Sequence, residues 1–283
     1  MKTLPNSEIK AITKLLKTYD EGTLKLLEEQ FKTFDIKTLK EINREISPDD
    51  IELQRNFLDL AYRIKREQLK NDFSKWSKNH PNDLEDGIFL IAVFANPLLD
   101  VNHYSGLLTA WADSISTNLQ KIKLNSDPTS IINEINHFLF MELRFKGNKE
   151  DFYDPENSFI DKVIEKKSGN PILLSMIYLL VTKRIGLSFC GVNMPAHFLV
   201  QYKDIFEPIF IDPFNQGELI TKSVCQERVK ALKLPWQEDY LSSPTNKYII
   251  VRMLQNLINI YHNNEQFDLK EYLEDYVNII KRG

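Results

Sequence analysis

The chain has little glycine and cysteine. Its 283 residues include 9 glycines and 2 cysteines, Cys190 and Cys225. Scarce glycine disfavours glycine-rich phosphate loops and turn-dense all-β folds, and it favours helices. The two cysteines form no CxxC pair, and the 5 histidines are scattered along the chain. Because structural zinc sites and disulfide frameworks need closely spaced ligands or paired cysteines, we expect no metal site, no disulfide and no cofactor.

A strong excess of charge and a long apolar run are also missing. The net charge is −4, so the basic surface that neutralises nucleic-acid phosphates is not indicated. The N-terminus lacks the apolar segment of a secretory signal. The longest apolar run, Pro171–Val181, is shorter than the about 20 residues that span a bilayer. We therefore expect a cytoplasmic protein that binds neither nucleic acid nor membrane.

Helical periodicity dominates the first half of the chain. From residue 1 to about 145, apolar residues recur at three- and four-residue spacing, as between Ile9 and Leu16. The segment Leu84–Ala95 is apolar nearly all round, which predicts a buried helix that ends before Pro97. We therefore expect a helical N-terminal region over residues 1–145.

The pattern changes after Gly186. Three segments have the β-branched and aromatic content of short strands: Leu187–Met194, His197–Tyr202 and Pro208–Asp212. Beyond them, two amphipathic helices are predicted over residues 244–263 and 268–282, and together they resemble one tetratricopeptide unit. One such unit needs neighbours to bury its apolar face, so we expect it to dock on the rest of the chain.

Two helices in tandem are predicted in the middle of the chain. Gly169 is expected to end the first helix in the left-handed conformation. Asn170 can then cap a second helix that begins with Pro171 and ends at Gly186. A proline in the first turn costs no hydrogen bond, because the first N–H groups of a helix have no partner inside the helix.

A histidine and an aspartate follow this helix. His197 and Asp212 are fifteen residues apart with turn residues between them, which permits a hairpin that sets them side by side on adjacent strands. We therefore predict a direct hydrogen bond between them, of roughly 2.7 to 3.2 Å. In cysteine enzymes such a histidine shuttles a proton, and the carboxylate fixes its tautomer and orientation.

Several ordered motifs span roughly residues 80 to 262: Leu84–Ala92, Asn96–Asp100, Tyr153–Ser158, Gly169–Ser175, Gly191–Phe198, Ile211–Phe214 and Arg252–Leu257. On these motifs the chain resembles the bacterial SirB family of transglutaminase-like proteins. The resemblance implies an α+β, predominantly helical fold with a papain-like core and a small antiparallel sheet. The core would occupy residues 146–222, and the C-terminal helical hairpin residues 223–283. Family members often carry glycine where Ala196 stands, and a longer tetratricopeptide-like tail.

The resemblance also implies where a nucleophile would stand. Cysteine enzymes of the superfamily carry it at a helix N-terminus, where exposed N–H groups and the helix dipole stabilise a thiolate. Counting back the superfamily's usual fifteen residues from Gly186 leads to Pro171. Proline has no nucleophilic atom and no N–H for an oxyanion hole. The leading hypothesis is therefore a pseudoenzyme that binds a protein or peptide partner, with His197 and Asp212 as a remnant pair that pins two strands together.

The alternative hypothesis is an enzyme of amide or acyl chemistry, a hydrolase or a transferase. His197 would be the general base, Asp212 its orienter, and Cys190 or Ser175 a displaced nucleophile. A hairpin through residues 191–196 could bring Cys190 opposite His197, although a strand cysteine should have an ordinary or raised pKa. The residues predicted to line the cleft are Asn170, Pro171, Ser175, Cys190, Pro195 and Phe214.

Overall fold

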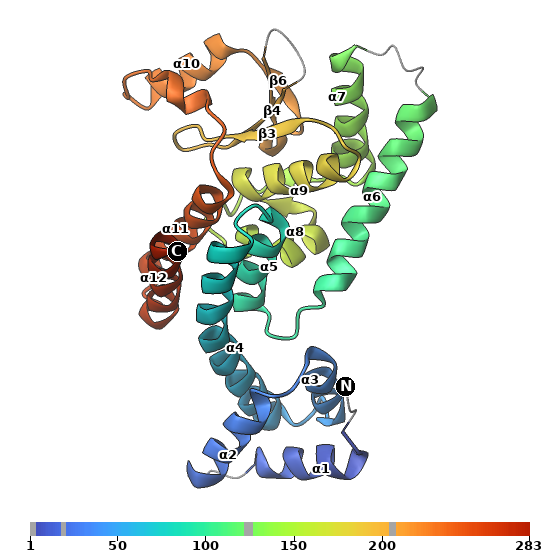
Figure 1. Cartoon of the computed structure of the whole chain (residues 1–283), viewed down its shortest axis with the longest axis vertical. Helices are drawn as coiled ribbons and strands as arrows, with labels where there is room; N and C mark the ends of the chain where they lie inside the picture. Colours follow the sequence, from blue (N-terminus) through green and yellow to red (C-terminus); the bar gives the residue numbers. More distant parts are fainter. Residues whose placement is uncertain (1–3, 18–20, 122–126, 204–207) are drawn as a thin grey trace.

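The computed structural model describes residues 4–17, 21–121, 127–203 and 208–283, and most of them are helical (Figure 1). The helices are α1 (Asn6–Leu15), α2 (Glu21–Phe31), α3 (Ile36–Glu45), α4 (Ile51–Asn79), α5 (Leu84–Ala95), α6 (Val101–Lys121), α7 (Pro128–Asn136), α8 (Ile160–Lys166), α9 (Pro171–Arg184), α10 (Lys222–Ala231), α11 (Asn246–Asn263) and α12 (Phe267–Arg282). The strands are β1 (Lys146–Gly147), β2 (Ser168–Gly169), β3 (Phe189–Val192), β4 (Leu199–Tyr202), β5 (Ile209–Asp212) and β6 (Glu218–Ile220).

Helices α1, α2 and α3 pack with the first half of α4 around a hydrophobic cluster of their own. They lie at one end of the molecule in Figure 1. The second half of α4 belongs instead to the main core, through Leu69, Phe73 and Trp76. The 29-residue helix α4 therefore joins the N-terminal cluster to the rest of the molecule.

The main core surrounds α9, in which every residue from Pro171 to Thr182 is buried. Helices α6 and α8 pack against α9, and α5 packs against α8. Helix α5 has the bounds that its all-round apolar sequence predicts. The same cluster extends to Ile280 at the C-terminus. This one cluster contains residues from all three predicted sections, 1–145, 146–222 and 223–283. The core therefore does not separate the sections, and that division of the chain stays a prediction.

The C-terminal pair α11 and α12 docks on α4 and α5, beside the core in Figure 1. The Ser77 hydroxyl on α4 donates to the Ile280 carbonyl at 3.1 Å. The Tyr276 hydroxyl donates to the Arg66 carbonyl at 2.8 Å. Two predicted amphipathic helices are thus present, and their apolar faces are covered by the preceding helices rather than by further repeats.

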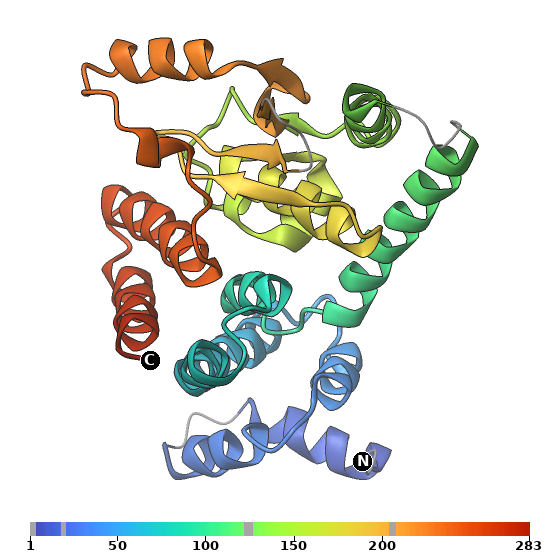
Figure 2. The same ribbon diagram turned by 45° about the horizontal axis from the view of Figure 1, so that its top comes forward.

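Strands β3, β4, β5 and β6 form an antiparallel sheet in that order (Figure 2). Alternate residues face opposite sides. Val200 and Ile211 join the core around α9, whereas Leu199 and Phe210 join a second cluster with α10. The three predicted strands are present with shorter bounds, and β6 was not predicted from the sequence. The fold is therefore mostly helical with a small sheet held between α9 and α10.

The start and end of α9 follow the prediction. The Asn170 side chain accepts a hydrogen bond from the Leu173 N–H at 2.9 Å, Pro171 is the first helical residue, and Gly186 ends the helix with φ +74°. The prediction for Gly169 was wrong, because the left-handed residue after α8 is Lys167, with φ +55°. Gly169 instead lies in β2, which pairs with β1. A Cβ at this position would lie 2.8 Å from the Val163 side chain, which would have to shift to make room for it.

No helix in the described part of the chain is long and apolar enough to cross a membrane.

Candidate functional site

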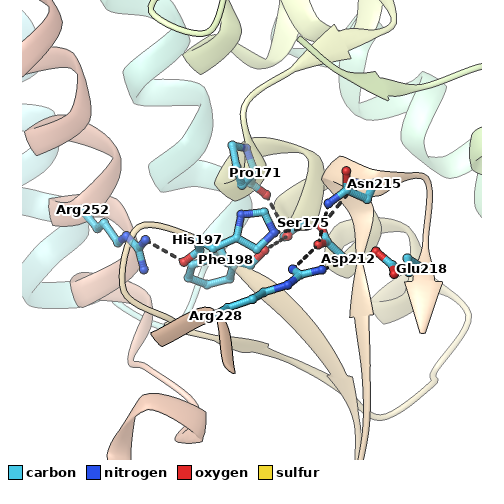
Figure 3. Close-up of polar contacts among 9 residues, drawn as sticks. All are labelled: Pro171, Ser175, His197, Phe198, Asp212, Asn215, Glu218, Arg228 and Arg252. Carbon is cyan, nitrogen blue, oxygen red and sulfur yellow. Dashed lines mark hydrogen bonds and ion pairs between the residues drawn. The ribbon is translucent and has the colours of Figure 1, made fainter. Parts of the chain in front are cut away.

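His197 and Asp212 lie side by side, as predicted. The Nε2 atom of His197 is 2.9 Å from Oδ1 of Asp212 (Figure 3). Asp212 is the last residue of β5 and is fully buried. His197 is not on a strand, contrary to the prediction, because the chain turns at residues 195–196 and β4 begins only at Leu199. The predicted hydrogen bond is confirmed, and its histidine comes from the loop between β3 and β4.

Asp212 is the centre of a larger polar cluster. Its Oδ2 accepts from Arg228 Nη1 at 2.7 Å and from the Asn215 side-chain amide at 2.9 Å, and its Oδ1 also accepts from the Asn215 N–H at 3.3 Å. Burial by itself would raise the pKa of Asp212, but the bonds from His197, Arg228 and Asn215 outweigh it and hold the pKa well below its ordinary value of 3.8. Asp212 is therefore ionised at neutral pH.

Sequence reasoning missed Arg228, which comes from α10 on the far face of the sheet. It lies sixteen residues after Asp212 and belongs to none of the motifs, so no local signal marks it. Its second nitrogen, Nη2, lies 3.4 Å from the Glu218 carboxylate. The arginine thus ties the site to both β6 and α10.

The ionised Asp212 fixes the state of the imidazole. A carboxylate only accepts hydrogen bonds, so the proton must be on Nε2 of His197. Within the described residues, no side chain forms a hydrogen bond with Nδ1, which keeps its lone pair in the neutral ring. The His197 side chain is 17% exposed. This geometry suits a general base that takes a proton through Nδ1.

Arg252 on α11 holds the loop that carries the histidine. Its guanidinium donates to the Asn193 side-chain oxygen, to the Met194 carbonyl at 3.1 Å and to the His197 carbonyl at 2.7 Å. Its carbon Cζ also lies 5.5 Å from the centre of the Phe198 ring. Burial lowers the pKa of Arg252. The C-terminal helix pair therefore positions the site, a role that only the motif Arg252–Leu257 hinted at.

His197 lines a cavity of about 230 Å³. The residues around it are Phe152, Tyr153, Asn170, Pro171, Ile172, Ala196, His197, Phe198, Arg252, Asn256, Asn259, Ile260 and Asn263. The cavity walls therefore come from the start of α9, the histidine loop, α11 and the segment before α8, not from the first 145 residues. Pro171 and His197 face the same space, and Figure 3 shows the proline beside the imidazole.

The two displaced nucleophiles are not beside the histidine. The Ser175 hydroxyl is fully buried and donates to the Pro171 carbonyl at 2.8 Å, with the Phe198 carbonyl at 3.4 Å (Figure 3). Cys190 pairs across the sheet with Gln201, so the alternative in which a hairpin brings it opposite His197 is wrong. The register places Val192 opposite Leu199, and Cys190 is therefore two residues further from the loop.

Burial makes both thiols weaker acids than an exposed cysteine. It raises the pKa of Cys190, and it raises the pKa of Cys225 to about 11. Both side chains are buried. Neither cysteine has the electropositive, accessible surroundings that a reactive thiolate needs.

Two further predicted cleft residues lie at the edge of the site. Pro195 lines a second cavity, of about 780 Å³, between the histidine loop and helices α11 and α12. Phe214 stands edge-on to the His197 ring, with centroids 6.0 Å apart. It also contacts Phe152, which lines the smaller cavity. Phe214 therefore supports the wall rather than forming it.

Over residues 4–17, 21–121, 127–203 and 208–283, no group of three or more His, Cys, Asp or Glu side chains could hold a metal ion.

A helix N-terminus packed beside a histidine that is bound to a strand aspartate is the arrangement of a transglutaminase-like core. Residues 102–255, more than half of the chain, match the family described as the transglutaminase-like superfamily. The chain belongs to this superfamily.

The relatives carry little functional information in their names. A UPF0162 protein of Xylella fastidiosa is 32% identical over 185 residues, which are 63% of this chain and 65% of that protein. A UPF0162 protein of Vibrio cholerae is 30% identical over 134 residues, 46% of this chain and 49% of that protein. F-box only protein 21 of Mus musculus is 27% identical over 201 residues, 59% of this chain and 31% of that protein. The matches thus span about two thirds or less of each relative. No solved structure gives a significant match.

Proposed function

We propose that this protein is a non-catalytic transglutaminase-like protein that binds a protein or peptide partner at the histidine cavity, in a regulatory or assembly role. The observation that supports this proposal is Pro171 at the first position of α9, in the wall that it shares with His197. We also propose that the chain belongs to the SirB family within the superfamily, on the motifs given above and its likeness to UPF0162 proteins.

Acyl transfer through a covalent intermediate needs a nucleophile within reach of the histidine. Pro171 offers none, and it also lacks the N–H that would stabilise an oxyanion at this helix start. The Ser175 hydroxyl uses its proton on the Pro171 carbonyl. Both thiols are buried with raised pKa values. Each of the three side chains that could replace the cysteine is therefore unsuited to the reaction.

In this proposal the polar cluster has a structural role. Asp212 joins the end of β5 to the histidine loop through His197 and to α10 through Arg228. Arg252 then joins the same loop to α11. The charges of a former catalytic site would thus hold open a pocket whose walls come from four separate segments.

One observation favours the alternative, an amide or acyl hydrolase. His197 is oriented by an ionised carboxylate and has a free Nδ1 at a cavity wall, as a general base requires. Such an enzyme would still need Cys190 or Ser175 to move, or a water molecule to take the place of the nucleophile.

Alkylation of the full chain by iodoacetamide at neutral pH separates the two candidates. We expect Cys190 and Cys225 to react slowly and at the same rate in the His197→Ala variant, because neither thiol contacts the imidazole. Cys190→Ser identifies which thiol reacts. Fast alkylation of Cys190 that is lost in His197→Ala would overturn the proposal.

The variant Pro171→Cys provides the positive control. A thiol at this helix start would face His197 and the helix dipole, so it should react much faster than the two native thiols. The double variant Pro171→Cys, His197→Ala should lose most of that rate. Equal rates in the two variants would show that Pro171 does not occupy the nucleophile's position.

A further inference from the structure

The two cavities beside the histidine loop form one groove. Ala196, Arg252, Asn256 and Asn259 line both the 230 Å³ cavity and the 780 Å³ cavity. Helix α11 forms their common floor. The groove therefore runs along α11. The 230 Å³ cavity is its histidine end, the 780 Å³ cavity beside Asn193–Ala196 and helix α12 is its other end, and Arg252 lines both.

A row of side-chain amides follows α11 through this groove. Asn256, Asn259 and Asn263 are three, four and seven residues apart, so they lie on one face of the helix. Gln255 on α11 and Asn278 on α12 add two more amides at the larger cavity. Within the described part of the chain, none of these five side chains forms a hydrogen bond with another protein group. Their donors and acceptors are thus available to a ligand.

 Each side-chain amide carries an NH₂ donor and a C=O acceptor, so the row offers both kinds of hydrogen-bonding group along one side of the groove.

The groove has little free charge to select a charged ligand. The Arg252 guanidinium donates hydrogen bonds to the Asn193 side chain and to two carbonyls of the histidine loop. Glu274 on α12 pairs with Lys270 at 2.8 Å. Arg252, whose N–H groups already bond to these neutral oxygens, is the one Lys or Arg side chain among the described residues that line the two cavities. The groove is therefore suited to a neutral, hydrogen-bonding ligand.

We propose that the groove binds an extended, uncharged main-chain segment of a partner protein, which deepens the proposed function and rests on it. A side-chain amide pairs with a peptide group through one donor and one acceptor. From Asn256 to Asn263 the helix rises about 10 Å, which is the length of about three residues of extended chain. The row can thus follow the backbone of a peptide laid along α11.

The histidine end of the groove adds a preference for an apolar side chain. Its wall contains Phe152, Tyr153, Ile172 and Ile260, with Pro171 at the start of α9. Phe152 and Tyr153 are 40% and 69% exposed, so they contribute ring surface that nothing in the described chain covers. A peptide whose backbone lies on the amides can place one apolar side chain in this pocket, beside His197.

The experiment uses the full chain and a random heptapeptide phage library, from which binders are selected and resynthesised with a fluorescent label. Fluorescence anisotropy then compares the wild type with the double variant Asn256→Leu, Asn259→Leu, which keeps side-chain size and removes the amides. The matched control is Asn133→Leu, an exposed asparagine on α7. Circular dichroism checks that all variants are folded.

We expect selected peptides rich in uncharged residues with one apolar position, at least tenfold weaker binding to the double variant, and unchanged binding to the control. Methylating the backbone nitrogens of the peptide should weaken binding to the wild type by a similar factor, and this test needs no change in the protein. Equal binding to the double variant, no effect of methylation, or no enriched peptide would overturn the inference. So would binding of oligosaccharides on a glycan array that is lost in the double variant.

Mass spectrometry of the recovered peptide separates this inference from the proposed function. A peptide that is bound and recovered intact agrees with a non-catalytic site, whether or not the amides matter. A peptide that is cleaved or attached to the protein, in a manner that His197→Ala abolishes, would instead overturn the proposed function.

Discussion

The variant Asp212→Asn tests how much the polar cluster contributes to stability. The wild-type carboxylate is fully buried and accepts four hydrogen bonds, two on each oxygen. Asparagine has one acceptor oxygen, so it can keep two of them, and its NH₂ group faces donors in place of the other oxygen. The positive charge of Arg228 also loses its counter-charge.

Two charge-assisted hydrogen bonds contribute roughly 1.5 to 3 kcal/mol each. Arg228 is 31% exposed and still has Glu218 nearby, so water and that carboxylate recover part of the loss. We therefore expect Asp212→Asn to lower the free energy of unfolding by about 2 to 4 kcal/mol at pH 7, somewhat below the roughly 3 to 5 kcal/mol for a broken buried ion pair. Urea denaturation measures it, with the exposed Asp113→Asn on α6 as the control.

The pH dependence has a definite sign. The folded-state pKa of Asp212 is depressed below its ordinary value of 3.8. Its stabilising contribution is therefore fully present above the unfolded-state pKa, and it is lost as the pH falls below about 4 towards the folded-state value. The difference between wild type and Asp212→Asn should be constant from pH 7 to pH 5 and should shrink at lower pH.

The histidine reports on the same change. In the wild type, ¹⁵N chemical shifts of His197 should show a proton on Nε2, and in Asp212→Asn they should show a mixture of tautomers. A variant within 0.5 kcal/mol of the wild type at pH 7, on the order of the effect of an ordinary surface substitution, would refute this reasoning. So would a stability difference that does not shrink in acid.

Three further predictions follow from single features of the fold. Ala196→Gly should raise the free energy of unfolding by up to about 1 kcal/mol in urea denaturation, because φ is +56° at this residue and glycine tolerates it; a loss of stability would contradict this. Asn170→Ala should cost about 1 to 2 kcal/mol, since it removes the cap on Leu173 and the bond to Ser158, and an unchanged midpoint would contradict it. A chain truncated after Asp239 lacks α11 and α12, which cover α4 and α5, so it should show no cooperative unfolding; near-full-length stability would contradict the docking of the helix pair.

The local pattern of the sequence was enough to predict some of the site. Asn170 before Pro171 marks a helix start by cap chemistry alone, and Gly186 marks its end, because both effects depend on residues within one turn. The pairing of His197 with Asp212 was also predictable, since a short hairpin connects them. The position of the missing nucleophile required the family resemblance in addition.

Contacts between distant segments could not be read from the sequence. Arg228 reaches Asp212 because α10 packs on the far face of the sheet, and Arg252 reaches the histidine loop because α11 docks beside it. The register of β3 and β4 places Cys190 opposite Gln201 and away from His197, although the sequence spacing alone had permitted Cys190 to lie opposite the histidine. A single residue of register moves every side chain to the other face of a strand, so spacing alone does not fix it.

The sequence by itself determined the helical class, the start of α9 and the absence of a nucleophile there, because composition, periodicity and capping act over a few residues. Only the tertiary structure decided that the amides of α11 line the same groove as His197 and that a buried aspartate is shared between a histidine and an arginine. These features depend on how helices and strands pack, which is fixed by the burial of apolar surface over the whole chain.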